Sequence, residues 1–394
     1  MAVSNPGQAD RPTCLPQWLL WQARHQPRGV ALRHKRLGIW QVRSWQQAAE
    51  EMLGLAAGLQ ARGFTAEDSL LLLSRPRPEA LLLTLAAQWL GGVATLLDPL
   101  DEHATQVAGL RLVAPHFVFA EGPDELQRLQ TAELAPVLLL YADERVRLGN
   151  GVPALAYDRL LGVSQGLARP ASVANREALV FYRSAAAGGL ESQRIEHADL
   201  LREGRRLVRA ERLGNREEAL AARAFAAGGQ ARYLLAPWLI AGFRLNFPES
   251  LATRDSDRRA LGPTLVLGTR ETYGRLYARV QQRLPAVGSW RRRWLEAALV
   301  AQPRGLAGGF GHLLFRRPLR DLLGLSRTRV PLLVGEPLDE PVRAFFSALG
   351  IEVRTWPEAD RWQASAPTAP TARVAPPPWV DSLARPGWKE HAHV

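Results

Sequence analysis

The chain has 394 residues, of which 47% are hydrophobic and 22% charged, so it can bury a large core in two or more lobes. Its one cysteine, Cys14, excludes an internal disulfide, and its first residues lack the charged and apolar regions of a secretory signal. The net charge is +12, with Lys35 and Lys389 as the only lysines among many arginines, and no nucleic-acid-binding motif accompanies this excess.

The first part of the chain predicts a flexible leader, a helix, a hairpin and a second helix. Ser44 is an expected N-cap, and Gln47 lies three positions later, which is the spacing of a capping box. Gly63 is the expected end of that helix. Apolar periodicity places these elements at residues 1–14 (leader), Leu15–His25 (helix), Val30–Leu32 and Ile39–Val42 (hairpin strands) and 44–63 (helix).

Helices and strands then alternate along the chain. Ser69–Leu73 predicts a strand, Pro78–Leu90 a helix and Gly92–Leu97 a further strand. Ala80–Leu97 is an uncharged run of 18 residues, the lower limit for a membrane span. A glycine pair at 91–92 divides this run, which favours a buried helix followed by a buried strand. The alternation predicts a layered α/β fold.

The stretch Leu179–Leu200 has the composition of a phosphate-binding loop. Leu179–Tyr182 predicts a buried strand, and Ser184–Gly189 is a loop of small residues whose backbone N–H groups can approach an anion. A helix is expected to begin at Ala198, so the order is strand, loop and helix. Such a loop normally carries a lysine, and this one has none.

The order of these elements resembles the adenylate-forming (AMP-binding) superfamily, and most of all its fatty acyl-CoA synthetases. The resemblance implies the layered α/β large N-terminal lobe of that fold over residues 15–360. It also implies that the C-terminal lid, which carries the family's catalytic lysine, is missing, and that residues 361–394 form a Pro/Ala-rich disordered tail. The segments that carry the resemblance are 44–99, 116–130, 179–200, 245–249, 262–268, 290–298, GHLLFRRPLRDLLG at 311–324 and AFFSALGIEV at 344–353.

By this resemblance, the family's phosphate loop, Y-T-S-G-T-T-G-x-P-K-G, corresponds to residues 182–192. Both threonines of its T-T pair are alanines here, and Glu191 stands at the lysine position. One charge pair at about 5 Å is worth about 3 kcal/mol at an effective dielectric constant near 20, so an unpaired Glu191 would oppose a triphosphate. Arg183 or Arg194 is the alternative phosphate ligand. The residues of this degenerate loop are Tyr182, Ser184, Gly188, Gly189, Glu191 and, beyond it, His197.

Two further family motifs have lost polar groups. The Y-G-x-T-E motif, which contributes to the nucleotide and metal sites, corresponds to residues 356–360; Trp356 begins it, and Asp360 retains a carboxylate suited to Mg²⁺. The P-R-V-(Y/W)-E element corresponds to residues 270–274, where the arginine and the glutamate are both replaced. We therefore expect no catalytic residue, no resident metal and no cofactor.

The leading hypothesis is a cytoplasmic pseudoenzyme retained as an acyl-binding, protein-binding or regulatory subunit. One alternative is an active long-chain fatty acid–CoA ligase that uses ATP, Mg²⁺ and CoA with a lid supplied by another chain. Another is a scaffold that acts through the Pro-rich tail. Arginine clusters at 205–212, 291–293 and 316–320 indicate either solvated helix faces or peripheral contact with an anionic membrane surface, and no nucleic-acid partner is expected.

Overall fold

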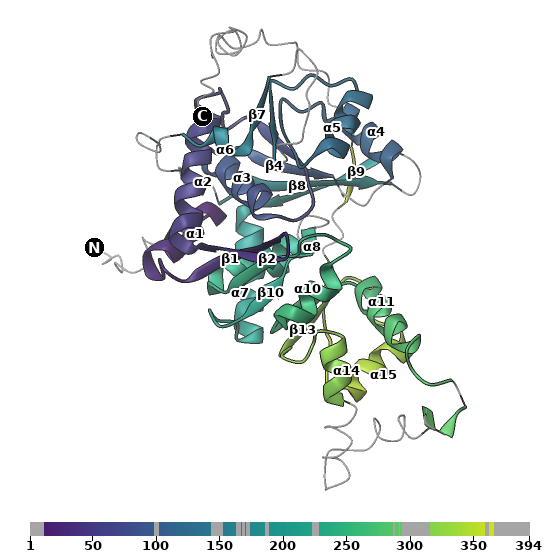
Figure 1. Ribbon diagram of the computed structural model, residues 1–394. Helices are drawn as coiled ribbons and strands as arrows, with labels where there is room; N and C mark the ends of the chain where they lie inside the picture. Colours follow the sequence, from purple (N-terminus) through teal and green to yellow (C-terminus); the bar gives the residue numbers. More distant parts are fainter. Residues whose placement is uncertain are drawn as a thin grey trace, which may run out of the picture. The chain divides into compact units, whose positions relative to one another are not determined.

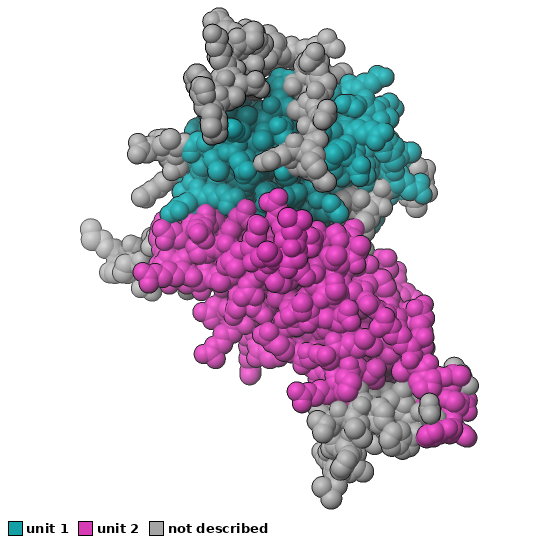
Figure 2. All heavy atoms as spheres, in the orientation of Figure 1, with its two compact units in different colours: residues 1–17, 49–197, 361–394 teal, residues 18–48, 198–360 magenta. Residues whose placement is uncertain are grey.

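Two compact units make up the protein, and each combines separate stretches of the chain (Figure 2). Unit 1 comprises residues 1–17, 49–197 and 361–394, and unit 2 comprises residues 18–48 and 198–360. Each unit has its own mostly parallel sheet with helices, so the layered α/β prediction is confirmed (Figure 1). The computed structural model describes residues 12–97, 102–142, 153–162, 167, 170, 174–185, 189–222, 228–286, 288–290, 292–293, 316–358 and 362–365.

Unit 1 contains an eight-stranded sheet in the order β15-β9-β8-β4-β3-β5-β6-β7. The strands from β3 to β8 are parallel, while β9 runs antiparallel to β8 and β15 antiparallel to β9. The strands are β3 (Ser69–Leu73), β4 (Val93–Leu97), β5 (Phe117–Ala120), β6 (Leu138–Tyr141), β7 (Ala154–Ala156), β8 (Glu177–Ser184), β9 (Leu190–Glu196) and β15 (Gln363–Ala364).

The uncharged run that begins at Ala80 forms a buried helix and a buried strand, as predicted. Every residue of α3 is buried, and Gly91, with φ of 87°, turns the chain toward β4. Parallel strands covered on both faces need such continuous apolar sequence. No helix in the described part of the chain combines the length and apolar character needed to cross a membrane. The helices of this unit are α3 (Pro78–Trp89), α4 (His103–Val113), α5 (Pro123–Thr131), α6 (Tyr157–Leu160) and α2 (Trp45–Gln60) from residue 49 onward.

Unit 2 contains a seven-stranded sheet in the order β14-β13-β12-β10-β11-β1-β2, with only β2 antiparallel. Its strands are β1 (Val30–Arg36), β2 (Ile39–Ser44), β10 (Glu218–Leu220), β11 (Arg244–Phe247), β12 (Leu265–Gly268), β13 (Val330–Val334) and β14 (Arg354–Trp356). Its helices are α1 (Leu15–His25) from residue 18, α7 (His197–Glu211) from residue 198, α8 (Gly228–Gln230), the π-helical η1 (Ala231–Leu235), α9 (Ala236–Ala241), α10 (Arg254–Leu261), α11 (Arg270–Gln281), α14 (Arg317–Leu322) and α15 (Glu340–Ala348).

Local sequence signals account for the first elements of unit 2. Leu37 and Gly38 both have positive φ, at 49° and 78°, which suits a two-residue hairpin turn between β1 and β2. At the start of α2, the Gln47 N–H donates to Ser44 Oγ at 3.1 Å, and the Ser44 N–H donates to Gln47 Oε1 at 2.8 Å. The predicted capping box is therefore present.

Two predictions need correction. The helix expected from Ala198 is present as α7, which begins at His197, but strand β9 (Leu190–Glu196) lies between the loop and this helix and was not predicted. Period-two alternation in LESQRIE was the signal for this strand. Gln363 and Ala364, placed in the tail by composition, form β15 against β9. Residues 1–11 and 366–394 lie outside the described residues, so the leader and the rest of the tail remain predictions.

Candidate functional site

The phosphate-type loop connects the two strands of a β-hairpin in unit 1. Ser184, at the exposed end of β8, pairs with Leu190 of β9. Ala185 donates its N–H to the carbonyl of Gly189 at 3.1 Å, and Gly189 has φ of 85°, a conformation that glycine adopts readily. Gly188 lies outside the described residues. The loop therefore lies where the sequence predicted it, but it connects two strands and not a strand and a helix.

Glu191 is paired with Arg183, its neighbour across the hairpin. One carboxylate oxygen, Oε2, accepts from Arg183 Nε at 3.0 Å and from Nη2 at 2.9 Å. The two side chains are 49% and 29% exposed, so water screens part of this attraction. The pair still neutralises the Glu191 charge locally. Because Glu191 is paired, it repels a triphosphate less than was estimated for an unpaired Glu191.

Trp362 holds the same arginine from a second side. The guanidinium carbon of Arg183 lies 4.0 Å from the centre of the Trp362 ring, which is cation–π geometry. β15 brings the tryptophan there, because Ala364 pairs with Glu191 and the Ser365 N–H donates to the Leu190 carbonyl at 2.8 Å. The C-terminal segment thus extends the hairpin by one strand.

The other arginine considered for phosphate binding also faces an acid. Arg194 Nη1 lies 2.8 Å from Glu177 Oε2 on the neighbouring strand. Tyr182, on the same strand β8 as Glu177, is half-buried and packs against an apolar cluster of unit 1. Burial raises the pKa of the Tyr182 phenol, and Glu177 also raises it while Arg194 lowers it. Both arginines of the hairpin are therefore held by carboxylates.

His197 is buried at the start of α7 and does not lie on the loop. Its side chain is 1% exposed, and its Nδ1 accepts from the Leu15 N–H at 3.4 Å. Burial lowers the pKa of the imidazole to about 4, so the ring is neutral at physiological pH. The contact with Leu15 gives His197 a structural role.

His197 predicts a loss of stability in mild acid. Its folded-state pKa of about 4 lies below the unfolded value of 6.5, so the unfolded chain binds a proton first as the pH falls. The stability it contributes is present above about pH 6.5 and is lost toward pH 4; by pH 5 the loss is about 2 kcal/mol. Urea unfolding at both ends of this range, in the wild type and in His197→Asn, measures it. An equal pH dependence in both proteins would contradict the assignment.

The remaining predicted residues lie in unit 2 or outside the described part of the chain. Trp356 ends β14, where the Arg206 guanidinium lies 5.0 Å from its ring and the Tyr233 ring 5.4 Å away. The Tyr233 hydroxyl donates to the carbonyl of Pro357 at 2.8 Å. Trp356 thus packs among other side chains, and Asp360 is not described.

The P-R-V-(Y/W)-E element forms the start of α11. Arg270 is paired with Glu336 at 2.9 Å and with Asp339. Tyr273 is fully buried, and its hydroxyl donates to the Leu332 carbonyl at 3.0 Å. These side chains support the packing of unit 2.

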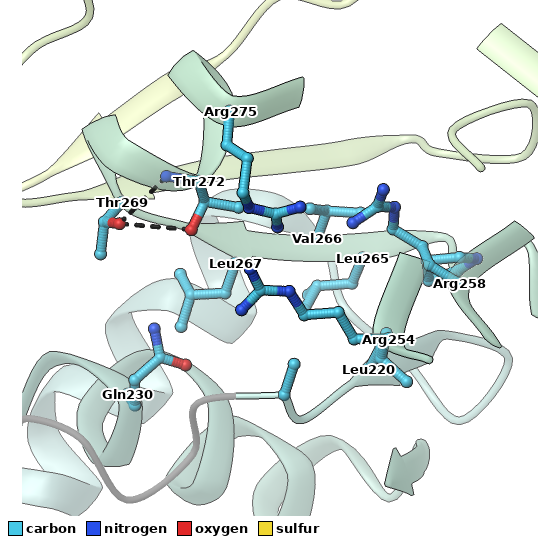
Figure 3. Close-up of a pocket in the computed structure, with 12 residues that line it drawn as sticks. Leu220, Gln230, Arg254, Arg258, Leu265, Val266, Leu267, Thr269, Thr272 and Arg275 are labelled. Atoms are coloured by element: carbon cyan, nitrogen blue, oxygen red, sulfur yellow. Dashed lines mark hydrogen bonds between the residues drawn. The ribbon is translucent and has the colours of Figure 1, made fainter. Parts of the chain in front are cut away.

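A pocket in unit 2 was not predicted from the sequence (Figure 3). Arg254 and Arg258 on α10 and Arg275 on α11 line one side, and leucines of β10 and β12 line another. The sequence feature that could have indicated it is the charge-rich segment RDSDRR at 254–259. Such runs are usually solvated helix faces, so the segment alone did not predict a pocket.

Comparison with known proteins identifies the family. Residues 19–356 match the AMP-binding enzyme family. A fatty acyl-adenylate ligase from L. pneumophila, in complex with acyl adenylate and pyrophosphate, superposes with a TM-score of 0.59 at 14% identity, covering 87% of this chain and 53% of that one. The A domain of carboxylic acid reductase from Segniliparus rugosus, in complex with AMP and a co-purified carboxylic acid, gives 0.66 at 15% identity, with coverages of 88% and 60%. The Klebsiella oxytoca NpsA N-terminal subdomain gives 0.55 at 16% identity, with coverages of 87% and 71%. A search of curated proteins found no match.

The chain belongs to the AMP-binding enzyme family, and its fold is that of the large N-terminal lobe. It spans about half the length of the Legionella enzyme. In the described hairpin, Arg183 and Arg194 are paired with the carboxylates of Glu191 and Glu177. Among the residues that the structure describes, no group of three or more His, Cys, Asp and Glu side chains is placed to hold a metal ion.

Proposed function

We propose that this member of the AMP-binding family does not form acyl-adenylates and instead acts as a subunit that binds an acyl ligand or a partner protein. One observation carries the proposal: the ion pair between Arg183 and Glu191, at the position where the family's loop has its lysine. Trp362 covers the same arginine. A loop whose charges are satisfied within the hairpin has little attraction for a triphosphate.

The acyl part of the proposal draws on the structural relatives. The Legionella ligase was crystallised with an acyl adenylate, and the Segniliparus domain with a carboxylic acid. The fold of this chain covers the same lobe, so an acyl group is the ligand class to test first. A cytoplasmic location, and contact of the arginine-rich helices with an anionic membrane surface, remain proposals.

ATP–pyrophosphate exchange tests the absence of adenylation. We expect no acid-dependent exchange above a boiled control for short-, medium- or long-chain fatty acids. The purified full chain should be assayed beside an active acyl-adenylate ligase. Acid-dependent exchange clearly above the control would overturn the proposal and favour an active ligase.

A double variant tests whether the Arg183–Glu191 ion pair is the reason for weak nucleotide binding. Arg183→Thr with Glu191→Lys restores the residue types of the family loop at these two positions. A free lysine in place of a neutralised pair should raise the affinity for Mg-ATP at least tenfold, or about 1.4 kcal/mol. Calorimetry of both proteins measures the change. Equal, weak binding in both would show that the charges of the hairpin do not control nucleotide binding.

A further inference from the structure

The edge of the unit 2 sheet at which its parallel strands begin is rich in arginine, and we call it the arginine edge. The strand register aligns one row of residues across five strands: Leu32, Leu245, Ala219, Leu265 and Val330. The five strands run in the same direction, so residues that precede this row lie along one edge of the sheet. The arginines that precede the row by four positions or fewer are Arg28, Arg216, Arg244, Arg327 and Arg329.

The end of α7 brings two more arginines to this edge. Arg209 lies in the last turn of α7, and Arg212 follows in the short connection to β10. The Arg212 N–H donates to the Arg209 carbonyl at 3.4 Å, and the Glu217 N–H donates to the Gly214 carbonyl at 3.2 Å. These two turns make the connection compact, so both arginines lie near the start of β10.

Glu218 is shared by three arginines of this region. Its carboxylate lies 3.2 Å from Arg33 Nη1, 2.8 Å from Arg244 Nη1 and 3.3 Å from Arg327 Nη1. The Glu218 side chain is only 5% exposed, so the arginines surround it. One carboxylate carries a single negative charge, and it therefore compensates for one of the three guanidiniums.

The neighbouring acids also have partners of their own. Glu217 is buried and paired with Arg329, and Glu211 Oε2 lies 2.6 Å from Arg354 Nη2. Glu352, which precedes β14, accepts from a serine hydroxyl of α15 at 2.7 Å. Each of these acids compensates for one arginine at most, so the arginine edge keeps a net positive charge.

Four arginines of the edge carry this excess as free cations. Arg28, Arg209, Arg212 and Arg216 are exposed, and their side chains make no hydrogen bond or ion pair with any residue that the structure describes. Of the four, Arg209 alone lies in the last turn of a helix, so compensation of a helix dipole does not explain the other three. Their guanidinium N–H groups are available to an anionic partner.

The residues around these arginines favour a partner that is recognised by charge alone. In the segments 26–29, 209–216, 242–244 and 326–329, the one aromatic residue is Phe243, and it is buried. Single-stranded nucleic acids are bound by stacking of bases on exposed aromatic rings, and a DNA groove is read by a whole helix or β-ribbon. These segments are strand starts and helix ends without such rings. An anionic lipid surface needs neither feature, because it attracts arginine through charge.

We propose that the arginine edge is the face through which the protein contacts a membrane surface rich in anionic lipids. Lipid headgroups present phosphate and carboxylate oxygens, to which guanidinium groups donate strong, charge-assisted hydrogen bonds. The inference rests on the proposed membrane contact and assigns it to Arg28, Arg209, Arg212 and Arg216, in place of the clusters at 291–293 and 316–320. It does not depend on the hairpin of unit 1, so it stands whether or not adenylation occurs.

Vesicle cosedimentation of the full chain, without ATP or fatty acid, tests this assignment. We expect binding to vesicles of phosphatidylserine and phosphatidylcholine, weakening as the salt concentration rises, and no binding to phosphatidylcholine alone. One arginine near an anionic surface contributes about fivefold in affinity, or about 1 kcal/mol. Arg209→Gln combined with Arg216→Gln should therefore weaken binding at least tenfold. Absence of binding to the anionic vesicles would overturn the proposal.

Arg36→Gln combined with Arg159→Gln is the matched control. Both arginines are exposed and have no partner among the described residues; Arg36 ends β1, four positions after the aligned row, and Arg159 belongs to unit 1. This variant removes the same charge from other places and should bind as the wild type does. Lysine at positions 209 and 216 keeps the charge and should also preserve binding. Equal weakening by the two glutamine variants would show an effect of net charge and contradict the assignment.

A nucleic-acid assay separates the two kinds of polyanion. Filter binding with duplex DNA and with poly(U), at the salt concentration of the vesicle assay, should give weaker binding than the anionic vesicles. Tighter binding to either nucleic acid than to the vesicles, lost in the variant with glutamine at 209 and 216, would overturn the lipid assignment. Weaker binding to both, with vesicle binding lost in that variant, supports it.

Discussion

Asp255→Asn is expected to lower the free energy of unfolding by about 3 kcal/mol, because it leaves Arg258, Arg275 and Arg279 without the carboxylate that they share. Removing one partner of a buried ion pair costs more than the pair contributes, since the remaining charge stays desolvated. Here three guanidiniums would face one another with no negative charge between them. The partial exposure of Arg275 and Arg279, at 32% and 28%, keeps the loss at the lower end of the usual range.

The ionisation of these groups supports the same conclusion. Burial acts to raise the pKa of the Asp255 carboxyl, but the hydrogen bond from Arg275 and the charges of the neighbouring arginines outweigh it, so the pKa is lowered. The pKa of Arg258 is lowered to about 10, chiefly by burial; Arg275 and Arg279 also lower it, while Asp255 opposes them. Asp255 is therefore charged and compensates for the desolvation of Arg258.

Urea unfolding at neutral pH measures the Asp255→Asn effect. Glu340→Gln is the control, since it removes an acid from a pair whose members are 71% and 68% exposed, and its cost should stay below about 1 kcal/mol. Equal stability of Asp255→Asn and the wild type would contradict the supporting role of Asp255.

Sequence reasoning succeeded where the determining interactions are local. The capping box at Ser44 and Gln47 joins residues three apart, and the α3–β4 division depends on a glycine turn inside an apolar run. Both are visible in a short window of sequence. The element order over 44–99 then carried the family resemblance, which the match over residues 19–356 confirms.

Sequence reasoning could not predict how the charged side chains of the site are paired, because their partners are distant in the sequence. The Arg183–Glu191 pair depends on the register of the hairpin, and the Trp362 contact depends on a strand more than 160 residues further along the chain. Neither pairing can be read from residue types alone. The arginine pocket was missed for the same reason, since Arg254 and Arg275 meet only when α10 and α11 are placed beside β12.

Gly58→Ala is expected to destabilise the protein by about 4 kcal/mol, because a Cβ at this position would overlap the backbone carbonyl of Leu160. One face of α2 approaches the segment 157–162 closely within unit 1. The Tyr157 hydroxyl donates to Glu51 Oε1 at 2.8 Å, and the Gly162 N–H donates to the Gly54 carbonyl at 3.0 Å. These two bonds fix the separation, so the backbone at Leu160 has little room to withdraw.

Gly54→Ala, one helical turn earlier on the same face, is the matched control. Its Cβ would lie 3.3 Å from Leu161 Cδ2 and 3.4 Å from the Gly162 carbonyl oxygen, which is tight but within contact distance. Replacing a helical glycine by alanine gains about 1 kcal/mol in helix propensity, which offsets this crowding, so the net change should be below about 1 kcal/mol. Thermal and urea unfolding of the two variants compares them directly. Both variants gain the same propensity, so a difference between them isolates the backbone contact at Leu160, and equal stabilities would contradict it.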